Sequence, residues 1–161
     1  MKVKIKKIHP NATIPKQATE LAGGWDVTAT EIEQVGDDLV ICKLGFALQL
    51  PKGYKLTLVP RSSITNTKWF IQNSPGLGDA DFLREYQFRF RALPENWEDR
   101  ITGLGCSSSL KTTLSYPQFP YEVGDRIGQV YLEEVIAIEF EEVEEFDFSN
   151  DRGGYGHTGV K

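Results

Sequence analysis

Apolar side chains recur at every second position along most of this chain of 161 residues. The clearest example is REYQFRFRA (84–92), in which aromatic residues alternate with glutamine and arginine. Successive side chains of a strand point to opposite faces of its sheet, so a period of two predicts strands rather than helices. On this basis we expect strands at residues 2–8, 39–50, 54–59, 84–92, 127–132 and 134–140.

Glycine and proline separate these segments and mark the turns between them. Only SSITNTKW (62–69) is compatible with a helix, and that helix would be short. Residues 93–120 lack sustained alternation and are rich in Ser, Thr, Gly and Pro, so we expect a long excursion between two strands. We interpret the acidic stretch 133–151 as a solvated strand and linker. The pattern predicts one all-β domain, a barrel or a jelly-roll-like sandwich.

Composition and charge exclude several classes of protein. The net charge of −5 argues against a broad nucleic-acid-binding surface, since such domains are usually basic. No run of about 18 apolar residues is present, so no membrane span is expected, and the N-terminus lacks the apolar region of a signal peptide. Cys42 and Cys106 form no CxxC pattern, and we expect two reduced thiols in a cytoplasmic protein.

Short polar clusters occur where a β-sheet core does not require them. Taken singly, each has an ordinary explanation, such as a turn, a surface ion pair at Arg61 or a solvent-facing Gln129. Together they contain arginine, serine, glycine, aspartate and an aromatic ring, which can bind phosphate, a metal ion and a flat base. This combination indicates a nucleotide with a polyphosphate chain. The clusters are LAGGWDVTA (21–29), VPRSSIT (59–65), NSPGLGDADF (73–82), GDRIGQV (124–130) and NDRGGYGHTGVK (150–161).

In order and in residue type, these clusters resemble the motifs of the trimeric, all-β dUTPases (deoxyuridine triphosphate nucleotidohydrolases). The family patterns are roughly AGxDL, RSS, GxIDxDYxGE, GDRIAQ and RGxGGFG[SH][ST]G, and the resemblance covers nearly the whole chain. It implies a jelly-roll-like homotrimer that hydrolyses dUTP to dUMP and pyrophosphate with Mg²⁺. It also implies a barrel domain at 1–148, and a mobile C-terminal arm at 149–161 that closes an active site of another subunit.

The resemblance assigns a role to each matching position. Asp79 matches the catalytic aspartate, which activates a water for attack on the α-phosphorus, and Asp26 matches an acidic residue near Mg²⁺, bound directly or through water. Hairpin groups around Gly76 would bind uracil. Arg152, His157 and Thr158 would meet the γ-phosphate end, while Tyr155 would stack on the base. The implied substrate-binding residues are Arg61, Ser62, Ser63, Gly76, Gly78, Phe82, Gln129, Arg152, Tyr155, Gly156, His157 and Thr158.

The third motif departs from the family pattern at two positions. Phe82 replaces a tyrosine that packs under the deoxyribose and excludes a 2′-hydroxyl. Phenylalanine keeps the ring face, so we expect this exclusion to remain, but it lacks the phenol hydroxyl. Gly78 replaces an isoleucine or valine, and we expect this glycine to loosen the hairpin backbone.

The stretch at 93–120 is roughly twenty residues longer than the family pattern, and long loops in compact domains are often functional. We therefore consider a lobe that contacts a protein partner or adds a trimer contact, with a passive surface elaboration as the alternative. Such insertions occur in some phage members of the family. If this chain is encoded by a phage, the expected cytoplasmic location is the cytoplasm of the host. Two rival functions remain, a dCTP deaminase-like relative and a weakly active or inactive nucleotide-binding relative that acts through a protein partner. The residues of the third and fifth clusters favour the dUTPase.

Overall fold

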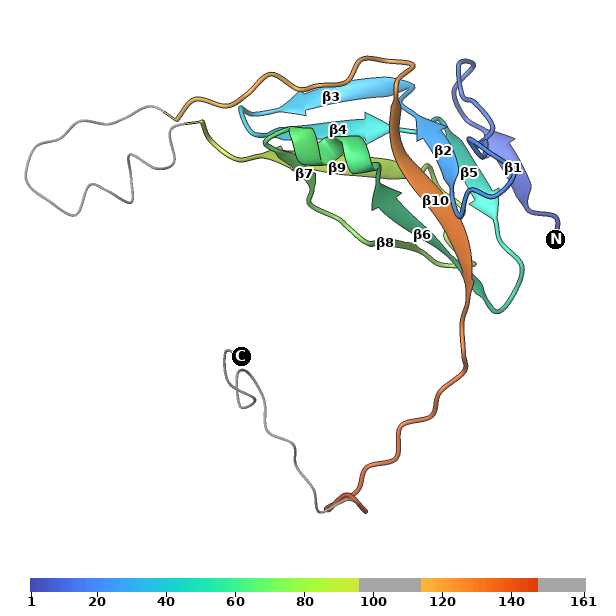
Figure 1. Cartoon of the computed structure of the whole chain (residues 1–161). Coiled ribbons are helices and arrows are strands. Elements are labelled where there is room, and N and C mark those ends of the chain that lie inside the picture. The colour runs from blue at the N-terminus through green and yellow to red at the C-terminus, as the bar shows by residue number, and fades with distance from the viewer. Residues whose placement is uncertain (96–113, 148–161) are drawn as a thin grey trace, which may run out of the picture.

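The computed structural model describes residues 1–95 and 114–147, and its regular structure is almost entirely antiparallel strand (Figure 1). The strands are β1 (Lys4–Lys7), β2 (Trp25–Thr28), β3 (Glu31–Val35), β4 (Leu39–Lys43), β5 (Phe46–Gln49), β6 (Tyr54–Pro60), β7 (Trp69–Ile71), β8 (Gly76–Gly78), β9 (Gln87–Ala92) and β10 (Arg126–Glu134). One short 3-10 helix, η1 (Ser62–Asn66), lies in the segment for which a short helix was expected. The all-β prediction is confirmed.

The strands form three sheets. Strand β1 pairs with β5, and the two larger sheets have the orders β2-β10-β6-β8 and β3-β4-β9-β7. Phe88 of β9 and Gly128 of β10 show how the larger sheets meet, because a Cβ atom on Gly128 would lie only 2.4 Å from the Phe88 ring. The two sheets therefore face each other as a sandwich, and Gly128 gives the aromatic ring its space.

The alternation in β9 determines the core as the sequence predicts. Phe88 and Phe90 are fully buried between the sheets, whereas Arg89 is exposed. Burying a phenylalanine side chain of this kind stabilises the fold by roughly 1.5–3 kcal/mol. Cys42 of β4 pairs with Phe88 across the sheet and is also fully buried. Burial raises the pKa of the Cys42 thiol to about 12, which keeps it protonated and unreactive. Cys106 lies outside the described residues.

The predicted strand at 39–50 is two strands that belong to different sheets. Strand β4 pairs with β3 and β9, while β5 pairs with β1. The break lies at Gly45, whose φ of 71° is a left-handed conformation that favours glycine. A Cβ atom there would also lie 2.8 Å from Thr30 Cγ2. Glycine thus permits the chain to turn from one sheet into the next.

Strands β2, β3, β7 and β8 are absent from the sequence prediction. They are only three to five residues long, and β2 carries the buried Asp26 while β8 carries two glycines. Such segments show no clear alternation of apolar and polar residues. Their place is set by pairing with longer neighbours, as β8 pairs with β6.

The prediction of a strand at 134–140 is wrong for the isolated chain, because no strand is present after Glu134 among the described residues. Strand β10 ends at Glu134, and the chain then runs away from the sheets (Figure 1). Ile136 is 80% exposed, Ile138 68% and Phe140 90%. The alternation of these apolar residues is real, but among the described residues no strand pairs with this segment, and strand backbone groups require partners.

Part of the excursion at 93–120 is tied to the sheets. The Glu95 N–H donates to the carbonyl of Ser115 at 2.8 Å, and Trp69 Nε1 donates to the carbonyl of Gln118 at 3.1 Å. The Phe119 ring packs edge-on against Trp69, with ring centroids 5.0 Å apart. Residues 114–120 therefore border the core, whereas 96–113 and the proposed lobe lie outside the described residues.

In the part of the chain that the structure describes, no helix is long and apolar enough to span a membrane.

Candidate functional site

Three of the five sequence clusters meet at Asp26. Gln129 Nε2 donates to Asp26 Oδ1 at 3.0 Å, and Arg126 Nη1 donates to Asp26 Oδ2 at 3.0 Å. Arg61 Nε lies 3.7 Å from Oδ1. Strand register explains the convergence, because Gln129 of β10 pairs with Asp26 of β2 on one side and with Val59 of β6 on the other. We call these four residues (Asp26, Arg61, Arg126 and Gln129) the Asp26 cluster.

The charges of the Asp26 cluster do not balance. Asp26 is 8% exposed, so its carboxylate requires partners, and two guanidinium groups provide them. The side chains of Arg61 and Arg126 remain 27% and 54% exposed. Each guanidinium has five N–H donors, so both keep donors for a further anion. Asp26 thus holds the two arginines in place and leaves an excess positive charge at the surface.

Ser62 and Ser63 follow Arg61 directly and begin η1. Both are exposed, while Ile64 is buried and anchors the helix. The hydroxyl of Ser63 lies 3.5 Å from that of Tyr121, just before the fourth cluster. The two serines of the second cluster therefore lie beside Arg61 of the Asp26 cluster, and Ser63 also approaches Tyr121.

Asp79 lies in the loop that connects β8 of one large sheet to β9 of the other. The two strands do not pair, so the β-hairpin expected here is not formed, and we use the name Asp79 hairpin only for the turn at residues 79–82. The Phe82 N–H donates to the Asp79 carbonyl at 3.1 Å and closes the turn, and both side chains are exposed. Gly76 and Gly78 face the interior from β8. A hollow of about 390 Å³ lies beside this hairpin, with Pro75 and Phe82 among its lining residues. The hairpin is thus open, and its aspartate is accessible.

Gly78 does not loosen this hairpin, contrary to our expectation. Its φ lies outside the left-handed region, and a Cβ atom there would lie 2.5 Å from Tyr86 Cε1. The Tyr86 ring fills the space that a larger residue at position 78 would take. Position 78 therefore requires glycine because the Tyr86 ring packs so closely, and not because the backbone there needs extra freedom.

Within one chain, the Asp26 cluster and Asp79 lie toward opposite ends of the same sheet. Gly78, which precedes Asp79, pairs with Leu56 of β6, whereas Arg61 follows the other end of β6. At roughly 3.3 Å per residue, Leu56 and Arg61 are about 16 Å apart along the strand. The second and third clusters are therefore not brought together by a single chain.

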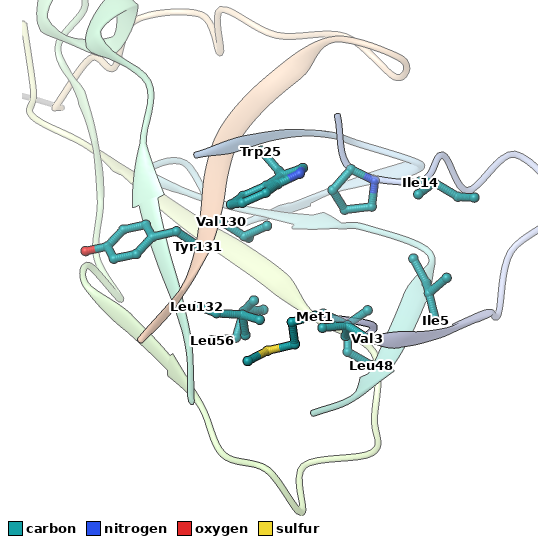
Figure 2. A pocket seen from close by; sticks show the side chains of 11 residues that line it. Met1, Val3, Ile5, Ile14, Trp25, Leu48, Leu56, Val130, Tyr131 and Leu132 are labelled. Atoms are coloured by element: carbon teal, nitrogen blue, oxygen red, sulfur yellow. The ribbon is translucent and has the colours of Figure 1, made fainter. Parts of the chain in front are cut away.

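An apolar groove of about 380 Å³ opens between β1 and β5 on one side and β2 and β10 on the other (Figure 2). Figure 2 shows that its side chains come from separate parts of the chain and gather around a common space. They include Val3, Ile5, Trp25, Leu48, Leu56 and Leu132.

Sequence reasoning missed two residues that contact the candidate site. Arg126 lies within GDRIGQV, and its place in that cluster was the available signal. Tyr86 alternates like an ordinary strand residue in REYQFRFRA, and nothing in the local pattern sets it apart. Arg152, Tyr155, Gly156, His157 and Thr158 lie outside the described residues.

Comparison with models of protein families gives no match. A deoxyuridine 5'-triphosphate nucleotidohydrolase of Helicobacter pylori (strain P12) is 36% identical over 163 residues, covering 99% of this chain and 98% of that protein. The dUTPase of Staphylococcus bacteriophage 80alpha, solved with dUPNHPP, matches with a TM-score of 0.74 at 22% identity over 99% of both chains.

A mutant dUTPase from phage phi11 of S. aureus, whose structure reveals the coordination of a structural Mg(II) ion, matches with a TM-score of 0.67 at 18% identity. That match covers 92% of this chain and 100% of that chain. The structural matches show a shared fold, and the sequence match over the full chain goes further. The chain belongs to the deoxyuridine 5'-triphosphate nucleotidohydrolase (dUTPase) family.

Proposed function

We propose that this chain hydrolyses dUTP to dUMP and pyrophosphate. The observation that carries the proposal is the convergence of three sequence clusters on Asp26. Two guanidinium groups around one carboxylate suit a polyanion, because their planar forks match phosphate oxygens. Family membership provides the substrate class, since the Helicobacter pylori relative is named for the triphosphate of deoxyuridine.

In the proposed reaction, Asp79 acts as the general base. Its carboxylate accepts a proton from a water whose oxygen attacks the α-phosphorus, while the bond from that phosphorus to the α,β-bridging oxygen breaks. Pyrophosphate leaves and dUMP remains. Arg61, Ser62 and Ser63 hold the phosphate chain, and Gln129 holds the α-phosphate region. The exposure of Asp79 supports this role, because a base must be reachable by substrate and water.

Mg²⁺, when bound, neutralises the charge that builds up on the leaving phosphate oxygens. Among the described residues, Asp26 is the proposed contact. Both of its oxygens already accept hydrogen bonds, which favours a contact through one of the waters that Mg²⁺ usually keeps. Within 1–95 and 114–147, no group of three His, Cys, Asp or Glu side chains offers a direct site.

The hairpin and the tail complete the proposed substrate site. Main-chain groups around Gly76 and Gly78 bind the uracil edge, and Phe82 packs under the deoxyribose. From the tail, Tyr155 stacks on uracil, glycine amides such as that of Gly156 approach the phosphates, and the γ-phosphate end is met by Arg152, His157 and Thr158. Closure of such an arm excludes water and aligns the reacting groups.

We also infer a homotrimer in which the C-terminal segments are exchanged between subunits. The separation of about 16 Å between Leu56 and Arg61 favours sites built from more than one copy. The exposed Ile136, Ile138 and Phe140 and the apolar groove of Figure 2 are complementary in character. A closed ring satisfies both, because every copy donates one segment and receives another. A cytoplasmic location fits the buried, protonated Cys42 thiol.

Release of pyrophosphate from dUTP tests the proposal, with Asp79→Asn as the matched control. We expect rapid release from the wild type and very little from the variant. A wild type no faster than the variant would overturn the proposal. Parallel incubation with dCTP identifies a deaminase, which would yield dUTP, and binding of dUTP without turnover identifies a non-catalytic relative.

A further inference from the structure

Tyr86 links the core to the Asp79 hairpin. Its N–H donates to the Phe46 carbonyl at 3.2 Å, and its own carbonyl accepts from the Leu44 N–H at 3.0 Å. The side chain is only 3% exposed. Its ring contacts the Phe46 ring on the core side and the Phe82 ring on the hairpin side, with centroids 6.3 and 5.1 Å away. Tyr86 is therefore a rigid support behind the hairpin.

The hydroxyl of Tyr86 points to the backbone that carries Asp79. A Cβ atom on Gly78 would lie 2.9 Å from this hydroxyl, and Asp79 is the next residue. Only glycine at position 78 lets the phenol reach this place. Gly78 at the end of β8 and Tyr86 just before β9 are therefore matched in size.

This hydroxyl is also a buried polar group without a hydrogen-bond partner. Among the side chains of residues 1–95 and 114–147, it is the only buried nitrogen or oxygen atom of this kind. Such groups are destabilising and therefore rare in native proteins, where they often mark functional sites. Burial, and secondarily the negative charge of Asp79, raise the pKa of the Tyr86 phenol to about 12. The phenol is therefore a protonated donor that lies within the field of a carboxylate.

We propose that Tyr86 is a positioning residue for the hydrolysis, whose hydroxyl donates a hydrogen bond to the Asp79 carboxylate when substrate occupies the hairpin. The inference rests on the proposed function, in which Asp79 is the general base. An exposed carboxylate samples several rotamers, and a rigid donor would select the one that faces the attacking water. The same ring supports Phe82, so the groups that meet the sugar and the water share one support.

The test uses Tyr86→Phe in the full-length protein. The matched control is Tyr116→Phe, which removes a phenol from the segment that follows Ser115, beyond the end of β9 that lies far from the hairpin. Melting temperature, the Kd of the analogue dUPNHPP and kcat on dUTP are measured for each. We expect Tyr86→Phe to melt no lower than the wild type, because an unpaired hydroxyl has been removed. We expect the Kd to stay within about twofold and kcat to fall about tenfold.

A kcat within about twofold of the wild type would overturn the inference. A fall in kcat that is accompanied by a lower melting temperature and weaker analogue binding would also overturn it, since it would reveal a merely structural role. The double variant Gly78→Val/Tyr86→Leu restores volume without the hydroxyl and should show the same loss of kcat. A wild type inactive on dUTP overturns the proposed function as well, whereas an active wild type with an unaffected Tyr86→Phe overturns only this inference.

Discussion

The Asp26 cluster and the Asp79 hairpin are held in place by different interactions. In the cluster, hydrogen bonds and ion pairs join three charged side chains and the Gln129 amide from neighbouring parts of one sheet. In the hairpin, a buried ring fills the space beside a glycine, and the aspartate itself is exposed. A phosphate chain requires fixed charges, whereas a base that moves a proton requires freedom to approach a water. Each half of the proposed site is built for one of these needs.

The largest effect should come from two variants, each of which disables one of the two regions. Asp79→Asn and Arg61→Ala should each lower kcat on dUTP by roughly 10²-fold or more, because one lacks the base and the other a phosphate fork. If each site combines the cluster of one subunit with the hairpin of another, co-refolding the two variants in equal amounts should restore about a quarter of the sites. Pyrophosphate release measures the recovery.

Wild-type protein taken through the same refolding serves as the control for that mixing experiment. A mixture whose activity is only the sum of the two parent activities would contradict a shared site, because the cluster and the hairpin of each site would then come from the same chain.

Removal of the central carboxylate should destabilise the cluster and leave the hairpin intact. Asp26→Ala leaves Arg61, Arg126 and the Gln129 amide without their shared acceptor, and we expect a loss of about 2 kcal/mol in the free energy of unfolding. Urea denaturation measures this loss. Asp26→Asn keeps one oxygen acceptor and should lose less. Equal losses for the two variants would show that the carboxylate charge is unimportant.

A methyl group at position 78 should destabilise the hairpin through packing alone. In Gly78→Ala the new Cβ lies 2.5 Å from Tyr86 Cε1, and overpacking of this kind costs about 1–3 kcal/mol. Gly23→Ala is the matched control, because nothing lies within 4 Å of that position. Combining Gly78→Ala with Tyr86→Leu should recover part of the loss. A Gly78→Ala protein as stable as the control would contradict the close contact.

The smallest effect concerns high pH and again distinguishes the hairpin. The pKa of Tyr86 is raised from 10.0 to about 12, so the folded state holds a proton that the unfolded state releases. This contribution is complete below pH 10 and is lost as the pH rises toward 12. At pH 11, Tyr86→Phe should recover about 1.4 kcal/mol relative to the wild type. Identical pH dependence in the two proteins would show that folding does not raise the pKa of the Tyr86 phenol.

The sequence predicted those parts of the fold in which one strand carries its own signal. Strands β6 and β9 alternate cleanly and form where expected, whereas β2 and β8 are too short to show a period. The alternation at 134–140 identified a real apolar face, but a face is buried only if a partner exists, and none lies among the described residues. Periodicity describes one strand and carries no information about its neighbours.

The sequence likewise predicted which residues form the site, but not how residues from different strands contact one another. The clusters identified Asp26, Arg61 and Gln129, and strand register then brought them together. Two features depended on the fold itself: the pairing of Asp26 with Arg126, and the separation of Asp79 from Arg61. The role of Tyr86 was hidden as well, because it depends on the absence of a side chain at Gly78, on a different strand.

The hydrogen bond between Glu95 and Ser115 has a consequence for how this protein can vary. It closes the base of the excursion, so that the two chain ends enter and leave the sheets at one point. Doubling the length of a loop that starts and ends at a closed base costs only about 0.6 kcal/mol. We therefore expect insertions and deletions between residues 95 and 115 to leave β9 and β10 undisturbed.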